Sequence, residues 1–223
     1  MYLTILIPCL NEEKTIGICI KKAKEFIEKN KIEAEILIVD NGSTDNSIQI
    51  AKKLETRIIF VKEKGYGNAL IQGTKAAKGK YIIMGDADDS YNFLELDEFI
   101  RKLDDGYDLV IGNRFKGKME KGAMKVLHRY IGTPLISMIA RKRHKIKIYD
   151  INCGLRAYDR KKIIRTNCTS SGMEYASEMV IKAQKNNLKI CEIPINFYKD
   201  KRGRSSHLNT ISDGIRHLKL ILK

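Results

Sequence analysis

Short apolar runs alternate with segments of helical periodicity through the first half of the chain. The apolar runs are nearly continuous in Ile, Leu and Val, which is typical of strands that are buried on both faces of a sheet. We predict strands at Leu3–Pro8, Glu35–Asp40, Arg57–Lys62, Lys80–Gly85 and Asp108–Asn113. We predict helices between them, at Glu12–Lys29, Asp45–Leu54, Tyr66–Ala77 and Leu94–Leu103. This alternation predicts an α/β fold in which helices flank a doubly wound, mostly parallel sheet.

The pattern changes after about residue 115, where the chain becomes mixed and more basic. A helical stretch spans Gly122–Ala140, and we expect Pro134 to bend or split it. The basic run Arg141–Lys145 follows directly. Further elements are predicted near the end of the chain: a helix at Met173–Lys185, a strand at Lys189–Phe197 and a final helix. Because no repeat, low-complexity tract or linker interrupts the sequence, we expect a single domain over residues 1–223.

The charge balance adds a second clue, because 42 Lys and Arg residues against 27 Asp and Glu residues give a formal net charge of +15. Such a surplus attracts polyanions, including nucleic acids, anionic lipid headgroups and phosphorylated substrates. A solvated, lysine-rich surface, as in many heat-adapted proteins, explains the same surplus. Hydrophobic residues make up 43% of the chain, so there is enough apolar material for a core and disorder is not expected.

Five scattered cysteines argue against a disulfide framework or a zinc site, since their number is odd and no Cys-x-x-Cys pair occurs. They fit a reducing cytosol. The first apolar run, Leu3–Pro8, is typical of a strand and not of a signal peptide. The longest mainly apolar stretch, Ile131–Ala140, is about half as long as a membrane span. We therefore expect a cytoplasmic protein without a spanning helix, able to lie against a membrane surface.

Two carboxylates follow the apolar strand that ends near Gly85. Asp86 and Asp88 are two residues apart, and such a pair can share a hard divalent cation, Mg²⁺ or Mn²⁺. A cation with few protein ligands keeps positions open for the oxygens of a leaving diphosphate, whose charge it stabilises. The alternative is that Asp88, Asp89 and Ser90 cap the following helix. We assign Asp89 to that capping role.

Other strand-to-helix turns are also polar, as expected where such sheets bind ligands. Asp40 ends the second predicted strand and can accept hydrogen bonds from a base or a ribose. Helix capping is enough to explain Ser43–Asp45. Gly65–Asn68 resembles a phosphate-cradling loop, but it lacks the spacing of a P-loop and its Lys-Ser/Thr ending.

These motifs occur in a fixed order: Thr4–Glu13 (TILIPCLNEE), Ile36–Asp45 (ILIVDNGSTD), Gly65–Gly73 (GYGNALIQG) and Tyr81–Ser90 (YIIMGDADDS). In order, spacing and strand context they resemble family 2 glycosyltransferases, most closely the polyprenyl-phosphate sugar synthases of the dolichol-phosphate mannose and glucose synthase group. The resemblance continues through Gly112–Arg114, Asn152–Ala157, Glu174–Glu178 and Glu192–Ile195. It implies a GT-A-like, Rossmann-like single domain. Residues 1–115 would form the nucleotide-sugar-binding half, and residues 116–223 the acceptor- and membrane-facing half.

The resemblance also implies roles for individual residues in binding the sugar nucleotide. The nucleotide pocket would be lined by Pro8, Leu10, Glu12, Ile38 and Asp40. Asp86 and Asp88 would form the metal-binding Asp-x-Asp motif, with Ala87 alongside. Arg114 occupies the place of a family arginine near the donor sugar or diphosphate.

The family also uses a basic loop after its last strand to clamp the phosphates of the donor. Here we select Arg202 and Arg204, since arginine suits bidentate phosphate contacts. The loop has Asp200 and Ser206 where the mannose synthases have Arg and Lys, which leaves the transferred sugar open.

Asp88, Arg114 and Glu174 are the predicted catalytic residues. Glu174 and Glu178 lie one helical turn apart on one face, where they could provide a general base or position Arg156. Alternatively, they are ion-pair partners of the many lysines. A base is required if the acceptor is a sugar hydroxyl, whereas an ionised phosphate acceptor needs none.

The resemblance implies an inverting transfer of a sugar from a UDP- or GDP-linked donor to a polyprenyl phosphate, by a protein bound peripherally to the cytoplasmic face of a membrane. The predicted membrane contact is an apolar stripe flanked by basic residues, formed by Met124, Leu127, Ile131, Leu135 and Met138. A helix that buries this stripe in the core is the alternative.

Three other functions were weighed. Transfer to a sugar hydroxyl of a glycan or glycolipid remains open. A nucleotidyltransferase would normally show a glycine-rich, basic signature after its first strand, and Pro8–Glu13 does not supply one. A basic nucleic-acid-binding domain does not explain the acidic turns, which repel phosphate unless a metal intervenes. No nucleic acid partner is therefore expected.

Overall fold

The computed structural model of the chain describes residues 1–203 and 210–223. Within these residues a seven-stranded sheet has the order β3-β2-β1-β4-β6-β5-β7. The strands are β1 (Leu3–Cys9), β2 (Ala34–Asp40), β3 (Arg57–Phe60), β4 (Tyr81–Met84), β5 (Leu109–Asn113), β6 (Arg156–Asp159) and β7 (Ile190–Pro194). All pair in parallel except β6, which is antiparallel to β4 and β5. The predicted α/β fold with a mostly parallel sheet is confirmed.

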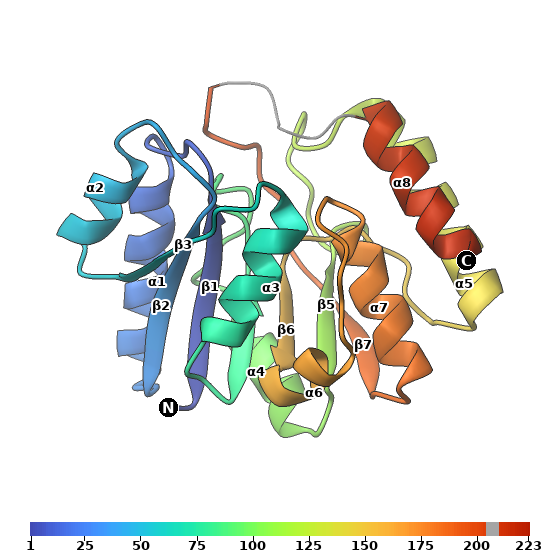
Figure 1. Ribbon diagram of the computed structural model, residues 1–223, viewed down its shortest axis with the longest axis horizontal. Coiled ribbons are helices and arrows are strands. Elements are labelled where there is room, and N and C mark those ends of the chain that lie inside the picture. The colour runs from blue at the N-terminus through green and yellow to red at the C-terminus, as the bar shows by residue number, and fades with distance from the viewer. Residues whose placement is uncertain (204–209) are drawn as a thin grey trace.

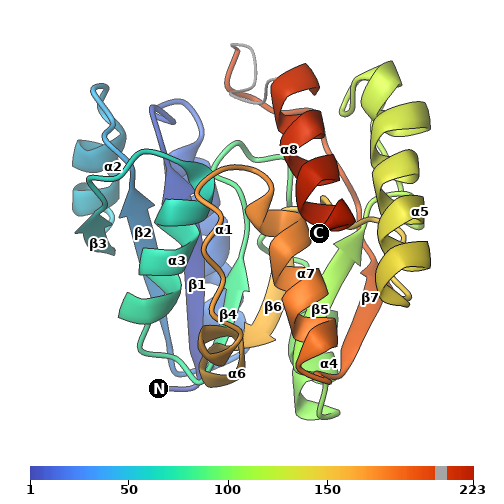
Figure 2. The same ribbon diagram turned by 45° about the vertical axis from the view of Figure 1, so that its right-hand side comes forward.

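Helices cover both faces of the sheet. They are α1 (Ile16–Lys29), α2 (Ser47–Lys53), α3 (Tyr66–Ala76), α4 (Asp97–Asp104), α5 (Thr133–His144), α6 (Arg160–Arg165), α7 (Tyr175–Lys185) and α8 (Thr210–Leu222). Figure 1 shows α3 and α7 in front of the sheet, with α1 and α4 behind it. At the β7 end, α5 and α8 pack against each other and against α7, as the turned view in Figure 2 also shows.

The first five predicted strands are confirmed to within two residues at each end. Their side chains form the core: in β1, for example, Leu3, Ile5, Leu6 and Ile7 are fully buried. Burial on both faces explains why these strands read as continuous apolar runs.

One strand was not predicted. Arg156–Asp159, for which the sequence predicted no strand, forms β6 and inserts between β4 and β5. It is short and begins with Arg156, whose side chain is fully buried. A charged residue is among the least expected in a buried strand, so hydrophobicity gave no signal here.

The stretch expected to be helical over Gly122–Ala140 is divided in two. A π-helical turn at His128–Gly132 precedes α5, and Pro134 lies in the first turn of α5, where its missing N–H breaks no helical hydrogen bond. Four of the five side chains of the apolar stripe are exposed, with Leu127 and Ile131 at 53% and 56%, and the fifth, Met124, is partly buried. The alternative of a core helix is therefore wrong. Among the described residues, no helix is long and apolar enough to cross a membrane.

A candidate active site at the carboxyl ends of the strands

The polar turns selected from the sequence meet at one edge of the sheet. Because β1 lies between β2 and β4, the turns that follow these three parallel strands are neighbours at the upper edge in Figure 1. Residues 199–203, which follow β7, contact the turns after β1 and β4. The structure thus brings the predicted acidic turns together with the first residues of the predicted basic loop.

Asp86 is held by a tyrosine and packed against a glycine. The Tyr66 hydroxyl donates a hydrogen bond of 2.9 Å to Asp86 Oδ1. A Cβ on Gly154 would lie 2.4 Å from Asp86 Oδ2, so a larger side chain would displace the carboxylate. The Gly154 amide is fixed by a 2.9 Å hydrogen bond to the Tyr91 hydroxyl. Burial, and then the negative charge of Asp88, raise the pKa of Asp86 to about 6.

Asp88 uses its two carboxylate oxygens differently. Oδ1 accepts hydrogen bonds from the amide and the hydroxyl of Ser90, at 3.0 and 2.5 Å. Oδ2 lies 3.1 Å from Nη2 of Arg202. One oxygen therefore fixes the turn, while the other faces a cation from the basic loop.

The assignment of Asp89 to helix capping is wrong. The next helix, α4, begins only at Asp97. Asp89 is buried, has a φ of 61°, and forms ion pairs with Lys22 of α1 at 2.6 Å and Lys201 at 2.7 Å. The sequence pattern could not reveal this, because both partners are distant along the chain.

Arg202 bridges two of the predicted acidic turns. In addition to Asp88, its guanidinium approaches Glu12 Oε1 at 3.5 Å and Asp200 Oδ1 at 3.5 Å. A cavity of about 170 Å³ lies beside it, lined by Asn11, Glu12, Glu13, Lys14, Asp45 and Arg202. Arg204, the other arginine selected from the loop, lies outside the described residues.

The other residues predicted to bind the nucleotide lie around the first two strands and the Asp-x-Asp turn. Asp40 accepts hydrogen bonds from the amides of Gly42 and Ser43, at 3.0 and 3.1 Å. Ile38 in β2 and Ala87 are buried. Pro8, within β1, and Leu10, which follows the strand, are both partly exposed. Their contacts with a nucleotide stay predictions.

The turns after β1 and β2 also bind each other, which corrects part of the capping assignment. The Ser43 hydroxyl accepts a hydrogen bond from the Asn11 amide at 2.9 Å, and Asn11 Oδ1 accepts one from the Thr44 amide at 2.7 Å. Ser43 and Thr44 therefore link two turns and do not cap α2. Asp45 does act at the start of α2, since its carboxylate accepts from the Ser47 amide at 2.9 Å.

Arg114 is bound by a carboxylate that sequence analysis did not select. Its guanidinium makes two hydrogen bonds to Asp150, at 2.8 and 2.7 Å, and lies over the ring of Phe197. Although burial alone would lower it, the negative charge of Asp150 helps hold the pKa of Arg114 well above its usual value. Nothing in the sequence pattern marks Asp150, which lies in an irregular segment.

The two glutamates near α7 have different environments, and neither positions Arg156. Glu178 accepts hydrogen bonds from the amides of Thr169 and Ser170 and pairs with Lys182 at 2.8 Å, as the ion-pair alternative predicted. Arg156 instead donates to three backbone carbonyls.

Glu174, the predicted catalytic base, accepts a hydrogen bond from the Gly172 amide through Oε1 at 3.2 Å. Its buried Oε2 has no hydrogen-bond partner within the part of the chain that the structure describes.

At the glycine-rich start of α3, two amides that could bind a phosphate are already hydrogen-bonded. The amides of Gly67 and Asn68 donate to the carbonyl of Ser171, at 2.9 and 3.3 Å. A Cβ on Gly67 would lie 2.0 Å from the Ser170 carbonyl oxygen, so the two segments touch through their backbones. The likeness of this turn to a phosphate cradle is therefore superficial.

Comparisons with known proteins agree with the fold and the motif order. The model of glycosyl transferase family 2 matches residues 4–166. The chain is 34% identical to the low-salt glycan biosynthesis hexosyltransferase Agl6 of Haloferax volcanii, over 99% of this chain and 53% of that protein. It is 29% identical to glycosyltransferase AglJ of the same organism, over 94% of this chain and 67% of that one. The chain therefore spans only about half the length of Agl6.

Solved structures show the same architecture. Glucosyl-3-phosphoglycerate synthase from Mycobacterium tuberculosis, in complex with Mn²⁺, UDP and glucosyl-3-phosphoglycerate, superposes with a TM-score of 0.75. The match covers 99% of this chain and 78% of that chain at 18% identity. The complex of the same enzyme with Mg²⁺ and UDP gives a TM-score of 0.76. This likeness confirms the GT-A-like fold.

Proposed function

Because this chain belongs to glycosyl transferase family 2, we propose that it transfers a sugar from a UDP- or GDP-linked donor to a polyprenyl phosphate. One observation carries the donor half of the proposal: Glu12, Asp88 and Arg202, from three distant segments, meet at one point. An arginine that is held among carboxylates at the carboxyl edge of a sheet is well placed to take up a diphosphate. Residues 1–115 would then form the donor half and residues 116–223 the acceptor half.

The carboxylates of Asp86 and Asp88 fit a divalent cation. Burial, and then the negative charge of Asp88, raise the pKa of Asp86 to about 6, and a bound cation would relieve both effects. No cluster of three or more His, Cys, Asp and Glu side chains suited to a metal occurs in residues 1–203 and 210–223. Mg²⁺ or Mn²⁺ would therefore have few protein ligands, and it would supply positive charge to the leaving diphosphate.

The protein's own side chains would do the rest. Tyr66 holds Asp86 in place, and Arg202 would exchange Asp88 and Glu12 for the donor diphosphate. An oxygen of the acceptor phosphate forms a bond to the anomeric carbon while the bond to the donor diphosphate breaks. The nucleoside diphosphate leaves with the electron pair, and the configuration is inverted. Since the attacking phosphate is already ionised, no proton has to be removed.

Nucleotide recognition is proposed for the turns after β1 and β2, through Pro8, Leu10, Glu12, Ile38 and Asp40, together with Ala87 and Arg114. Arg204 is proposed from the sequence alone, because it lies outside the described residues. For Ile38, which is fully buried, the contact would have to come through the backbone. Asp40 already accepts two backbone hydrogen bonds, so its role would combine fixing the turn with contacting a ribose.

A lipid-linked acceptor is supported by exposed apolar side chains around the start of α5. They share high exposure, between 40% and 74%, and comprise Val126, Leu127, Tyr130, Ile131, Leu135 and Met138. The exposed Lys121 and Lys125 and the partly buried Arg129 lie in the same segment. Apolar side chains with a basic surround are typical of segments that lie in the headgroup region of an anionic membrane. We propose that this surface rests on the cytoplasmic face of a membrane.

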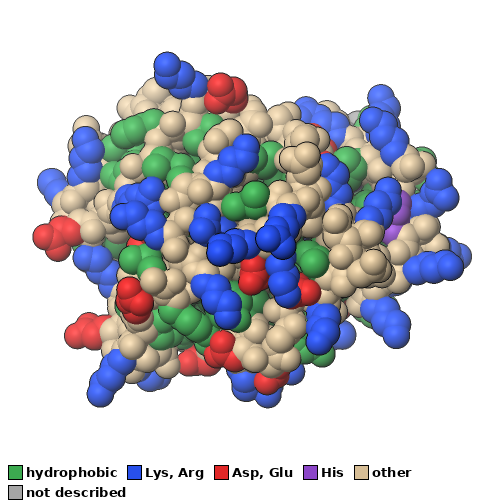
Figure 3. Space-filling view, turned by 60° about the horizontal axis from the view of Figure 1, so that its bottom comes forward, with side chains coloured by type: hydrophobic (Ala, Val, Ile, Leu, Met, Phe, Trp, Pro, Cys, Tyr) green, Lys and Arg blue, Asp and Glu red, His purple; other side chains and the backbone are tan. Residues whose placement is uncertain are grey.

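The net charge by itself does not identify a partner. Figure 3 shows Lys and Arg side chains spread over the face at the bottom of Figure 1, interspersed with Asp and Glu. Such an even distribution is typical of a solvated, lysine-rich surface. The membrane proposal therefore rests on the apolar segment and its neighbours and not on the +15 total.

Transfer to a sugar hydroxyl is the second candidate. It is favoured by Glu174 Oε2, a buried carboxylate oxygen without a hydrogen-bond partner among the described residues, which could accept the hydroxyl proton. The name of Agl6 places that relative in glycan biosynthesis, which fits either acceptor.

The decisive experiment supplies the purified protein with radiolabelled UDP- and GDP-sugars, Mn²⁺, and either a polyprenyl phosphate or a glycan acceptor. We expect label in the lipid fraction with at least one donor. Label only in glycan would favour the second candidate. A thermal-shift screen of UDP, GDP and their sugars, with and without Mn²⁺, tests donor binding independently of the acceptor.

A further inference from the structure

We propose that Asp89 is a positioning residue, which anchors residues 199–203 to α1 and thereby keeps Arg202 at the donor site. The inference rests on the proposed donor site and extends it to a residue outside the Asp-x-Asp pair. The Asp89 carboxylate pairs with Lys22 and Lys201. Arg202 instead pairs with Asp88, Glu12 and Asp200.

The anchor is built from one buried carboxylate and two lysines. The Asp89 side chain has no accessible surface, and its two oxygens accept from different ammonium groups: Oδ1 from Lys22 at 2.6 Å and Oδ2 from Lys201 at 2.7 Å. Lys22 belongs to α1, whereas Lys201 belongs to the segment above the site. A buried carboxylate with two cationic partners is retained far more firmly than an exposed pair.

Backbone bonds align the same segment with the Asp-x-Asp turn. The Tyr198 amide donates to the Ser90 carbonyl at 3.0 Å, and the Lys201 amide donates to the Asp88 carbonyl at 3.1 Å. The ion pair of Lys201 with Asp89 adds a side-chain contact to these two backbone hydrogen bonds. Since the Lys201 side chain is otherwise 58% exposed, packing does not hold it there.

The neighbouring Arg202 is held less tightly. Its approaches to Asp88, Glu12 and Asp200 measure 3.1, 3.5 and 3.5 Å, longer than either lysine contact of Asp89. This difference in distance fits different roles for Lys201 and Arg202. The Lys201 contact fixes the segment, while Arg202 is free to change partners when a diphosphate arrives.

The backbone of Asp89 points to the same role. Its φ of 61° lies in the left-handed region, which a residue other than glycine adopts at a cost. The turn accepts this conformation and directs the carboxylate inward between Lys22 and Lys201. A turn that served only to end β4 would be satisfied by glycine at this position.

The test compares Lys201→Met with Lys22→Met and Asp89→Asn. Lys201→Met is the most informative variant, because its exposed side chain can be changed without threatening the fold. Arg101→Met is the matched control: it removes another exposed ion pair, with Glu98 on α4, which lies behind the sheet in Figure 1. Two experiments are done: one measures hydrogen exchange of the amides in residues 199–203, and the other measures the KM and kcat for the donor.

For Lys201→Met and Asp89→Asn, we expect amide exchange in residues 199–203 to accelerate at least about tenfold and the donor KM to rise about tenfold, with kcat within about a factor of two. Asp89→Glu should restore part of the donor affinity. Lys22→Met should have a smaller effect on exchange, because it leaves the Lys201 contact in place, and Arg101→Met should have none.

Unchanged exchange and unchanged KM in Lys201→Met would overturn the proposal. So would a loss of thermal stability in Asp89→Asn while Lys201→Met exchanges and binds like wild type, because Asp89 would then serve only the fold. The exchange measurement needs no donor. If wild type binds no nucleoside diphosphate, the proposed function fails, yet accelerated exchange in Lys201→Met still reports whether Asp89 anchors the segment.

Discussion

The Tyr66 hydroxyl donates a 2.9 Å hydrogen bond to Oδ1 of Asp86, joining the first residue of α3 to the turn after β4. Tyr66 lies in a turn whose amides are already bonded to the Ser171 carbonyl. The 169–172 segment, α3 and the acidic turn are thus mechanically connected. A residue that looks like part of a phosphate-binding loop in the sequence instead orients a carboxylate.

Replacing Tyr66 with Phe should lower transfer about tenfold without unfolding the protein, since the ring is kept and only one hydrogen bond to a charged group is lost. Because this bond lowers the pKa of Asp86, its loss should raise that pKa above about 6 and move the acid limb of the pH–rate profile to higher pH. Tyr2→Phe, which removes a comparable bond to Asp104, is the control and should leave the profile unchanged.

Asp88→Ala and Asp86→Asn should each abolish transfer and remove the metal-dependent part of the stabilisation by a nucleoside diphosphate. Asp86→Asn should also raise the melting temperature measured without metal, because it removes a partly buried charge next to Asp88. Full activity of the wild type after EDTA treatment would contradict the metal assignment, whatever the variants do.

Arg202→Ala should weaken donor binding and turnover more than it weakens the fold, and Arg202→Lys should not restore them, because a single ammonium does not match a bidentate contact. Arg204→Ala, alone and combined with Arg202→Ala, tests the second selected arginine. Kinetics that do not change in the double variant would move the phosphate contact elsewhere, with Arg114 as the next candidate.

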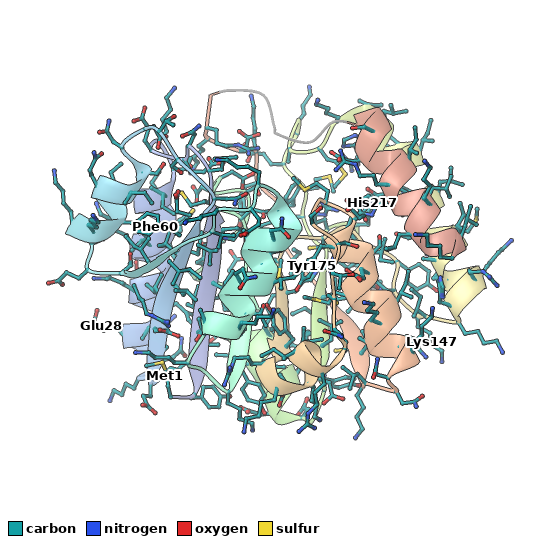
Figure 4. The ribbon with its side chains drawn as sticks, viewed as in Figure 1. Met1, Glu28, Phe60, Lys147, Tyr175 and His217 are labelled. Carbon is teal, nitrogen blue, oxygen red and sulfur yellow. The ribbon has the colours of Figure 1, made fainter. Side chains whose placement is uncertain are left out.

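The contact between α7 and α8 should respond to acid. His217 Nδ1 and the Ser177 hydroxyl are 2.7 Å apart. Figure 4 labels His217 between α8 and α7. Burial lowers the pKa of His217 from 6.5 to about 4, against the opposing effects of Glu174 and Asp213. Between pH 6.5 and about 4, the His217 imidazole therefore binds a proton in the unfolded chain but not in the folded one. Stability that is fully present above about pH 6.5 should be lost progressively as the pH falls to 4, by at most about 3 kcal/mol.

Urea unfolding at several pH values measures this dependence. His217→Gln should flatten the decline between pH 6.5 and 4, because it removes the titrating group. A slope in the variant equal to that of wild type would show that other groups cause the acid sensitivity.

The combined change of Leu127, Tyr130 and Ile131 to Ser should reduce binding to anionic vesicles and activity on long polyprenyl phosphates. Activity on a short, water-soluble polyprenyl phosphate should survive, because the acidic turns are untouched. Ile164→Ser, on α6, removes another exposed apolar side chain, at 38% exposure, and should change neither. Equal losses on both acceptors would mean that the segment supports the fold or the donor site.

The basic run at the C-terminal end of α5 provides a second comparison. Changing Arg141, Lys142, Arg143 and Lys145 to Glu tests whether this run contributes to vesicle binding, at roughly 1 kcal/mol for each residue near the surface. The run lies at the far end of α5 from Leu127 and Ile131, and Arg141 already covers the Tyr149 ring. We therefore expect a smaller effect than for the apolar variant, and binding in both cases should weaken in high salt.

The donor half of the fold could be predicted because its strands are buried on both faces, which leaves long apolar runs. Strand β6 could not be predicted, because it begins with a charged residue, Arg156. The Arg156 guanidinium donates to backbone carbonyls, so no acidic residue in the sequence marks its burial. Asp86, Asp88 and Arg202 were selected by motif and position. The contacts of Tyr66 with Asp86, of Asp150 with Arg114 and of Lys22 with Asp89 were missed, since each joins two segments and no local pattern records it.

The role of Asp89 could not be predicted from the local sequence either. A carboxylate before a predicted helix is usually a cap, and that expectation failed because the helix begins eight residues later and the backbone of Asp89 turns inward. The start of α4 is poorly marked in the sequence. The preceding segment, Tyr91–Leu96, is not helical, yet it contains apolar side chains that are buried in the core.

The pairing of Arg202 with Asp88 makes the two ligands of the donor site interdependent. A cation bound at Asp88 repels Arg202, unless a diphosphate gives that arginine another anion. Metal should therefore bind more tightly when the nucleotide is present, and by thermodynamic reciprocity the nucleotide should bind more tightly, by the same factor, when metal is present. In Arg202→Met the penalty on metal alone disappears, so the cooperativity between the two ligands should shrink.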